Sequence, residues 1–342
     1  MRKWNLMLLL PALAILSCSK DSVNELEESE QQLITEELTA NVEVAYPNEM
    51  GKVSDVYFAG QKMAMEEIDG DFVYQGDILF RSDMVTSQPV KLIYEKGEEP
   101  PQQKSVGRTS GRWPDNTVYY SIDSNLPDKN RVSDAIKHWE SNTPLKFVLR
   151  SGQSNYIYFT AGSGCSSYVG MIGGRQNVTL AASCSTGNTI HEIGHAIGLW
   201  HEQSRIDRNN HIKINWNNVQ SGREHNFKTY EESGLDGAEF TSTLDFGSIM
   251  MYGPYSFSSN GEPTIVKANG SLYSVQRTSL SAGDNQGIKS MYPVAGTTPT
   301  YINGEYYTID GLTVLRQYDR WYCYTRYGWK EVRQYQGYWF YA

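Results

Sequence analysis

One eleven-residue run constrains the fold and chemistry of this chain more than any other feature. It extends from His191 to His201 and reads H-E-I-G-H-A-I-G-L-W-H. His191 and His195 are four residues apart, so a helix places both imidazoles on one face, one turn apart. Gly198 can adopt the left-handed conformation that ends a helix. The chain can then turn back and bring His201 to the same point from another direction.

Three converging imidazoles predict a catalytic zinc site. Three neutral ligands leave a fourth position open, as catalytic zinc requires, whereas a structural zinc needs four protein ligands. Glu192 lies between the ligands and is suited to be the general base. The alternative is a buried helix with incidental histidines. Three of the chain's six histidines fall in this one run, which disfavours that alternative.

Length and charge limit the classes of protein to which this chain can belong. The chain has 342 residues, 39% of them hydrophobic, and carries a formal net charge of -9. This length favours about two domains plus processing segments. The negative charge argues against a nucleic-acid partner. Residues 21–50 hold much of the acidity and no Lys or Arg, so we expect residues 18–50 to form a solvated acidic tether. The acidic residues there are Asp21, Glu25, Glu27, Glu28, Glu30, Glu36, Glu37, Glu43 and Glu49.

The first residues read as an export signal. Arg2 and Lys3 precede the apolar run Leu6–Leu16, which is too short to span a bilayer as a stable helix. The run ends at Ile15-Leu16-Ser17-Cys18, which resembles a bacterial lipobox. That resemblance implies a signal peptide over 1–17, a lipid on Cys18 and a lipoprotein of the outer membrane or cell surface. An ordinary signal peptide with an incidental Cys is the alternative.

The remaining cysteines fit an oxidising compartment. Cys165 and Cys184 are nineteen residues apart, and we expect them to form a disulfide. Cys323 is then left alone, either as a free thiol or as an intermolecular link.

The chain divides into a precursor segment, a body and a tail. We expect an inhibitory propeptide over 51–104, with strand-like stretches at 72–74 and 78–80. Residues 97–112 have loop composition and basic residues typical of a cleavage junction. The body covers 105–296, with strands at 118–122, 147–149 and 156–159. We expect helices over 128–143 and 281–292, and a zinc helix beginning near 186–189.

The tail, residues 297–342, differs in composition from the rest. Residues 307–318 recur as 324–335, with glycines flanked by β-prone aromatic residues. This pattern predicts two short hairpins in one small all-β module. Its aromatic side chains either form the core of a tiny domain or provide a surface that binds a glycan or a protein.

Beyond His201 the chain resembles one family closely. The motif continues as Glu202-Gln203-Ser204-Arg205-Ile206-Asp207-Arg208, which is similar to the continuation in the astacin family of zinc metalloendopeptidases. Residues 244–252 resemble the Met-turn of that family, and 164–170 resemble its substrate-side strand. Other metzincin branches share the three histidines but lack this continuation. The resemblance covers roughly 105–295.

The resemblance implies a fold and a set of roles. The fold is α+β, a metzincin-type domain with a twisted mixed sheet, an active-site helix and an irregular C-terminal subdomain. One catalytic zinc ion is held by His191, His195 and His201. Glu192 is the base, Tyr252 binds the zinc at rest and then the oxyanion, and Met250 lies beneath the zinc. Cys165–Cys184 matches a family disulfide.

Three further residues take roles from the resemblance. Tyr74-Gln75-Gly76-Asp77 resembles the latency motif, so Asp77 would ligate zinc in the precursor; a β-turn Gly-Asp is the plainer interpretation. Glu202 would pair with the new N-terminus after cleavage, unless it is a surface acid. Arg277 would lie in the pocket after the scissile bond and favour acidic side chains, unless it is a surface Arg.

These inferences predict a secreted zinc-dependent endopeptidase that hydrolyses internal peptide bonds of extracellular proteins. An activating protease would cut the latent precursor. Because the lipid is on Cys18 and the junction lies near 104–112, cleavage would release the body from its membrane anchor. The competing hypothesis is a surface binding or adhesion protein acting through residues 297–342, but the complete ligand set and base disfavour a pure binding role.

Overall fold

A computed structural model describes most of the chain from Glu43 to Ala342. It describes residues 43–58, 61–89, 93–94, 111–233, 235, 239–293, 303–309, 312–318, 320–335 and 338–342. The predicted signal peptide, Cys18 and most of the predicted acidic tether lie outside the described residues. Most of the predicted cleavage junction lies outside them too.

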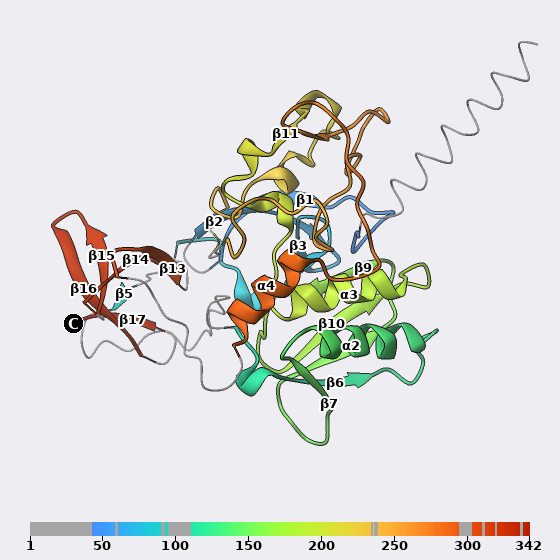
Figure 1. Ribbon diagram of the computed structural model, residues 1–342, viewed down its shortest axis with the longest axis horizontal. Helices are drawn as coiled ribbons and strands as arrows, with labels where there is room; N and C mark the ends of the chain where they lie inside the picture. Colours follow the sequence, from blue (N-terminus) through green and yellow to red (C-terminus); the bar gives the residue numbers. More distant parts are fainter. Residues whose placement is uncertain are drawn as a thin grey trace, which may run out of the picture. The chain divides into compact units, whose positions relative to one another are not determined.

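A nine-stranded sheet runs through the body and the segment predicted to be a propeptide, which keeps that name below (Figure 1). Its order is β1-β2-β3-β4-β9-β10-β8-β6-β7. The propeptide strands are β1 (Lys52–Phe58), β2 (Gln61–Ile68), β3 (Asp71–Tyr74) and β4 (Ile78–Phe80), and the body strands are β6 (Thr117–Ile122), β7 (Lys146–Leu149), β8 (Tyr156–Thr160), β9 (Cys165–Tyr168) and β10 (Arg175–Leu180). The body strands are parallel except β9, which runs antiparallel to β10.

Two helices pack against the body part of this sheet. They are α2 (Asn130–Asn142) and α3 (Thr186–Ala196), and Trp139 of α2 donates a hydrogen bond from its indole Nε1 to the carbonyl of Ile190 in α3, at 3.1 Å. One buried cluster joins Val132 of α2, Ile157 of β8 and Ile193 of α3. The predicted strands, the helix with its buried face and the zinc helix are therefore confirmed.

The propeptide joins the body by extending its sheet. β1 to β4 form an antiparallel meander, and β4 then pairs in parallel with β9, with Ile78 opposite Ser167. Met63, Met65 and Phe80 of the propeptide share a buried cluster with Tyr230 of the body. A short 3-10 helix, η1 (Ser82–Met84), follows β4.

The expectation of a solvated tether through residue 50 is wrong for residues 43–45, whereas residues 47–50 are exposed as expected. Glu43 and Ala45 are each only 3% exposed. The amide of Ala45 donates to the carbonyl of Gly76, and the amide of Cys165 donates to the carbonyl of Val44, at 3.2 Å. The polar composition of this stretch predicts solvation. Glu43 instead forms a buried ion pair with Arg277 of the body, which holds the segment there.

The C-terminal half of the body is irregular, as expected. It contains a two-stranded sheet, one helix and several 3-10 turns around a separate buried cluster that includes Phe227, Ile265 and Tyr252. The elements are η3 (Glu202–Ser204), η4 (Arg208–Asn210), β11 (Ile212–Ile214), η5 (Trp216–Asn218), η6 (Glu224–Phe227), β12 (Ile265–Lys267) and α4 (Ala282–Met291). A further 3-10 turn, η2 (Pro114–Asn116), lies at the start of the body, before β6.

The tail forms an antiparallel sheet whose sixth strand comes from the propeptide. Its order is β13-β14-β15-β16-β17-β5. The strands are β13 (Tyr306–Ile309), β14 (Leu312–Gln317), β15 (Arg320–Thr325), β16 (Gly328–Tyr335), β17 (Tyr338–Tyr341) and β5 (Ile93–Tyr94). The two predicted hairpins are β13–β14 and β15–β16. Strand β17 and the contribution of β5 were not predicted.

Some aromatic residues of the tail form its core, and others are exposed and available for a binding surface. Trp339 is 1% exposed and belongs to the core of this sheet with Cys323. Tyr306, Tyr324 and Trp329 are exposed. The buried thiol of Cys323 is free and lies in that core, which does not suit an intermolecular link.

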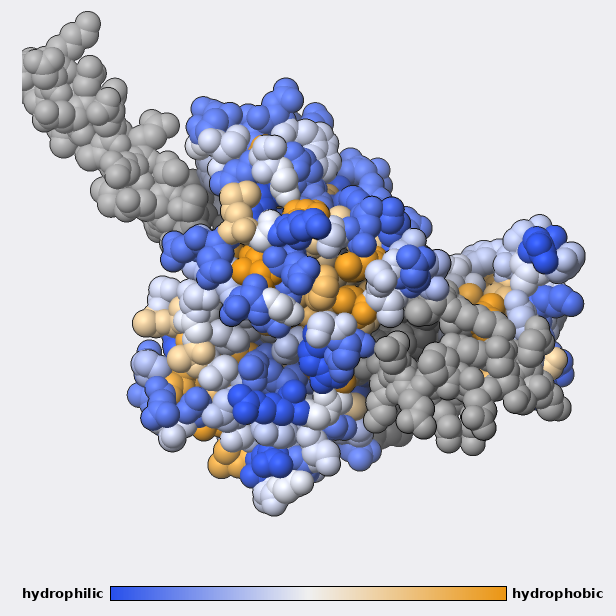
Figure 2. Space-filling view, turned by 180° about the vertical axis from the view of Figure 1, so that it is seen from behind, coloured by the Kyte–Doolittle hydropathy of each residue, from blue (hydrophilic) through white to orange (hydrophobic). Residues whose placement is uncertain are grey.

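Hydrophobic residues reach the surface in separate small areas on the face drawn in Figure 2. Among the described residues, the helices are all too short or too polar to serve as membrane spans.

Candidate metal centre

Local sequence fixes the start and end of the helix that carries the motif. The side chain of Ser185 accepts a hydrogen bond from the amide of Asn188, and the Asn188 side chain accepts one from the amide of Ser185, which caps α3. After Ile197 the chain turns at Gly198, which has a φ of +111°. Glycine adopts this conformation without steric cost, so the turn delivers His201 to the helix face.

Four side chains converge on one point. The ligand atoms of Asp77, His191, His195 and His201 lie within 4.8 Å of one another, and all four residues are buried. The Nε2 atoms of His191 and His201 are 3.3 and 3.2 Å from Asp77 Oδ2, and that of His195 is 3.7 Å from Oδ1. Ligands about 2.1 Å from a tetrahedral zinc are about 3.4 Å apart, so these spacings fit zinc.

The Nδ1 atoms of the three imidazoles have hydrogen-bond partners elsewhere in the protein. Nδ1 of His191 donates to the carbonyl of Ile249, and Nδ1 of His195 to that of Leu199, each at 2.8 Å. Nδ1 of His201 lies 3.1 Å from the side-chain oxygen of Gln75, in the propeptide. These contacts select the tautomer that leaves Nε2 free for a metal.

The loop that contains Ser248 and Ile249 is held in place by α4. Asp284 accepts hydrogen bonds from the Ser248 hydroxyl and from the Ile249 amide, at 2.6 and 3.0 Å. The carbonyl of Ile249 is the one that orients His191. Next to it, Met250 packs under α3, where a Cβ built on Gly194 would lie 2.7 Å from its Sδ. The loop predicted to be the Met-turn therefore packs against the helix that carries His191 and His195.

Glu192 is buried at the same site. Neither carboxylate oxygen has a hydrogen-bond partner among the described residues. Burial raises the pKa of Glu192 well above its ordinary value, and the charges of Asp77 and Glu43 raise it further. A carboxyl group in this state is suited to hold a proton, which is the property a general base needs after it has deprotonated water.

A tight propeptide turn presents Asp77 to the imidazoles. Gln75 and Gly76 have φ values of +50° and +83°, so the chain reverses just before Asp77. Burial opposes the ionisation of Asp77, but the nearby histidines outweigh it and hold its pKa well below the ordinary range. Asp77 is thus an anionic carboxylate at the point where the three imidazoles converge, and a carboxylate is a suitable fourth ligand for zinc.

Tyr252 contacts the propeptide in this structure. Its hydroxyl donates to the carbonyl of Gln75, and its ring lies 4.6 Å from that of His201. Burial raises the pKa of Tyr252 well above its ordinary value, and the charge of Asp77 adds to this. The hydroxyl is therefore a neutral donor beside the metal site, engaged by the propeptide backbone.

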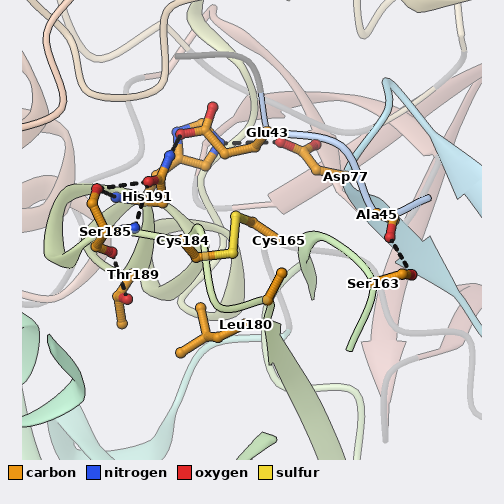
Figure 3. Close-up of a disulfide and its surroundings, with 12 residues drawn as sticks. Glu43, Ala45, Asp77, Ser163, Cys165, Leu180, Cys184, Ser185, Thr189 and His191 are labelled. Carbon is orange, nitrogen blue, oxygen red and sulfur yellow. Dashed lines mark hydrogen bonds and ion pairs between the residues drawn. A yellow bond between two sulfur atoms is a disulfide. The ribbon is translucent and has the colours of Figure 1, made fainter. Parts of the chain in front are cut away.

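An ion pair that the sequence did not reveal lies next to the metal site. Glu43 accepts from Arg277 Nε and Nη2 at 2.6 and 2.9 Å, and from the Asn188 side chain at 2.8 Å. Arg277 is 8% exposed, so it is not a surface Arg. Glu43 lies beside His191 and Asp77 in Figure 3. No motif marks Glu43, which the sequence presents as one of nine acids in a polar stretch.

Glu202 follows the third histidine and is mostly buried. Its Oε1 accepts from the Asp245 amide at 2.8 Å, and Arg205 Nη1 lies 3.7 Å away. Burial raises the pKa of Glu202 to about 8. Glu202 is therefore a buried acid whose ionised form would be stabilised by an additional cation.

The predicted disulfide is confirmed. Cys165 in β9 is bonded to Cys184, just before the cap of α3. Figure 3 shows this bond beneath Glu43 and His191. It therefore ties the strand that pairs with the propeptide to the start of the ligand helix.

Comparisons with known proteins agree with this geometry. The model of the family described as astacin (peptidase family M12A) matches residues 105–293. Protein SpAN of Strongylocentrotus purpuratus is 36% identical over 254 residues, which cover 69% of this chain and 41% of the relative. Zinc metalloproteinase nas-4 of Caenorhabditis elegans is 32% identical over 250 residues, covering 71% and 76%. The chain spans about two fifths of the length of the first curated relatives that it matches.

Solved structures are also similar. High choriolytic enzyme 1, a hatching enzyme zinc-protease from Oryzias latipes, has 27% sequence identity and a TM-score of 0.49, covering 53% of this chain and 92% of its own. The family model covers more than half of the 342 residues, and its region contains three imidazoles with zinc-ligand spacing. The chain therefore belongs to the astacin family of zinc metalloendopeptidases, peptidase family M12A.

Proposed function

We propose that this protein is an endopeptidase made as a latent precursor, in which Asp77 blocks the metal. One observation carries the proposal: a propeptide carboxylate lies 3.2 to 3.7 Å from the Nε2 atoms of all three histidines. Zinc has four ligands in such a site, so Asp77 fills the position that water needs. The precursor is inactive until the propeptide leaves.

Glu192 is the proton carrier of the proposed reaction. A zinc ion held by the three imidazoles supplies Lewis-acid chemistry, activating water and polarising the scissile carbonyl. Glu192 takes the proton from the water and delivers it to the leaving amine. Its burial supports this role, because a raised pKa makes the carboxyl a better proton acceptor.

Tyr252 is proposed to donate a hydrogen bond to the oxyanion. In the precursor its hydroxyl donates to the Gln75 carbonyl, and departure of the propeptide frees that donor. A neutral phenol beside the metal site can then stabilise negative charge that develops only in the transition state. Met250 has a supporting role under the metal ligands.

We propose that Arg277 selects an acidic substrate side chain. Glu43 forms a bidentate ion pair with this guanidinium, next to the metal ligands. A buried cation without its partner is costly, so an acidic side chain of the substrate is favoured once Glu43 has left. The vacated edge of β9 would hold the substrate backbone, as β4 now pairs there.

Glu202 is proposed to bind the new N-terminus after maturation. Its raised pKa reflects burial that one Arg205 contact at 3.7 Å does not offset. A new α-ammonium group would supply the missing positive charge.

Export as a lipoprotein is the proposed origin of the precursor. The Cys165–Cys184 disulfide supports passage through an oxidising compartment. A lipid on Cys18 would hold the precursor at the outer membrane or cell surface, and cleavage near 104–112 by an activating protease would release the body. The natural substrates would be extracellular proteins.

A second candidate function rests on the tail. Tyr306, Tyr324 and Trp329 are exposed, and the Trp329 ring contacts both tyrosines: the centroids are 5.9 Å apart for Tyr306–Trp329 and 5.2 Å for Tyr324–Trp329. Exposed aromatic groups of this kind stack on sugar rings or on protein surfaces. A glycan-binding or protein-binding role would accompany proteolysis.

The test of the protease proposal compares the chain before and after limited trypsin treatment. Peptide hydrolysis should appear only after a cut near 104–112, identified by N-terminal sequencing. It should disappear in Glu192→Ala and after zinc chelation. A cut form that holds stoichiometric zinc and hydrolyses no peptide would contradict the proposal and favour the binding role.

A further inference from the structure

The propeptide contributes a strand to the tail sheet. β5 pairs in parallel with β17, with Ile93 opposite Trp339 and Tyr94 opposite Phe340. Figure 1 shows β5 drawn among the strands of the tail, as this pairing requires. The strands β13 to β17 pair with one another in sequence order, and β5 is added at the end. The sheet is therefore completed by a segment that lies before the predicted cleavage junction.

Ile93 also covers part of the core of the tail. It packs against a buried cluster formed by Val314, Cys323, Val332 and Trp339. Trp339 is 1% exposed, and its ring lies 6.3 Å from that of Trp321, nearly at right angles. Loss of β5 would uncover apolar surface on this cluster and the backbone groups of β17 that pair with it. An open strand edge beside apolar surface favours pairing with another extended segment.

We propose that β17 is a binding site for an extended polypeptide strand, which the propeptide occupies in the precursor. The ligand class is a segment of a protein in β conformation, with an apolar side chain opposite Trp339. This inference rests on the proposed latent precursor, because it requires the propeptide to leave. The strand and Asp77 belong to the same propeptide, so its departure opens the metal site and the β17 edge together.

Covalent linkage explains why the site is closed before maturation. β5 is part of the same chain, so its effective concentration at β17 is on the order of millimolar. A separate strand at micromolar concentration cannot compete with it. After cleavage and dissociation that advantage disappears, and β17 accepts a strand from another protein. The mature protein would thereby gain a second contact with proteins that it cleaves.

The experiment measures binding of a fluorescent peptide that has the sequence of residues 88–97. All proteins carry Glu192→Ala, so that the peptide is not hydrolysed. We expect Ile93→Asp precursor to bind the peptide at least tenfold more tightly than the precursor with Ile93, because the Asp side chain cannot cover the apolar cluster. Matured protein freed of its propeptide should bind with the same gain.

Two controls separate this site from general destabilisation. Val53→Asp introduces the same charge at a propeptide position that is 40% exposed in β1, and it should leave the weak binding of the precursor unchanged. A peptide with Asp at the Ile93 position should not bind. If neither Ile93→Asp precursor nor matured protein binds more tightly than the original precursor, the proposal is overturned. The binding readout needs no peptidase activity, so failure of the proposed function would be detected separately.

Discussion

At the residue scale, the chemistry of the site could be predicted where a motif fixes it. His191, His195 and His201 follow from spacing alone, because the geometry of a helix and one glycine turn bring them together. Asp77 was predicted only from resemblance, and the structure brings it to the same point. Glu43, Gln75 and Asp284 were not predicted as contacts. Their roles depend on tertiary pairing that no local pattern encodes.

Asp77 gives the most direct prediction at this scale. Asp77→Ala removes the fourth ligand and should give the uncut chain peptidase activity on the order of tenfold or more above the uncut wild type. The measurement is hydrolysis of a quenched peptide by uncut chain, with the absence of cleavage verified by mass spectrometry. Asp83→Ala, which removes an exposed carboxylate from the same propeptide, is the control and should remain latent. An inactive, intact Asp77→Ala chain would show that other contacts alone maintain latency.

The Glu43–Arg277 pair predicts a pH dependence of precursor stability. Burial opposes ionisation of Glu43, but Arg277 and, to a lesser extent, His191 outweigh it and lower its pKa from 4.5 to about 2. A lowered folded-state pKa adds stability above the unfolded pKa, and this is lost as pH falls through the folded pKa. The advantage of wild type over Glu43→Gln should therefore fall by about 3 kcal/mol between about pH 5 and pH 2.

Urea unfolding of both precursors across that window measures this difference. Other carboxyl groups titrate in both proteins and cancel in the comparison. A stability difference that stays constant from pH 5 to pH 2 would show that Glu43 is not ionised by Arg277 in the precursor.

At the element scale, long patterned segments and the short apolar strand β4 were predicted well, but β5, β11 and β12 were not. The alternation in β8 and the apolar face of α2 mark a strand and a helix whatever surrounds them. β5 has only two residues and exists because β17 supplies its hydrogen bonds. β11 and β12 are three residues each, and they too depend on their partner. Elements of this length carry no periodicity to detect.

The contact between the propeptide and the strand β9 predicts the effect of one small substitution. A Cβ on Gly164 would lie 1.9 Å from the carbonyl oxygen of Val44 and 2.6 Å from that of Ala45. Both atoms are backbone atoms of the segment that precedes the propeptide and would leave with it, so Gly164→Ala should displace the segment that carries Glu43. We expect the propeptide of the cut chain to bind more weakly, by on the order of 1–3 kcal/mol.

The measurement is propeptide retention on size-exclusion chromatography after cleavage. Gly287→Ala is the matched control, because its Cβ would meet only ordinary contacts, the nearest at 3.6 Å from Phe240. The melting temperature of the mature body should be similar in both variants. If Gly164→Ala retains its propeptide as well as wild type does, the segment around Val44 is not an essential part of the inhibitory interface.

At the scale of the whole molecule, the propeptide has several independent attachments. Asp77 reaches the metal ligands, Glu43 pairs with Arg277, Glu66 pairs with Arg223, and β4 extends the body sheet. The catalytic region and the small C-terminal sheet could be predicted from motifs and composition. The extent of these attachments could not, because they join residues far apart in the sequence. The proposed inhibition would therefore be distributed over these attachments, and the metal would contribute one part of it.

This distribution predicts how metal removal affects the cut precursor. Chelation removes the bond between Asp77 and zinc but leaves the ion pairs and the strand pairing in place. Propeptide release from trypsin-cut chain should accelerate, by on the order of tenfold or more. In Asp77→Ala the release should already be fast and should not respond to the chelator. The rates can be followed by fluorescence of a labelled propeptide with the protein diluted after cleavage. If chelation accelerates release equally in both proteins, the metal holds the propeptide by stabilising the body, and Asp77 is not the link between them.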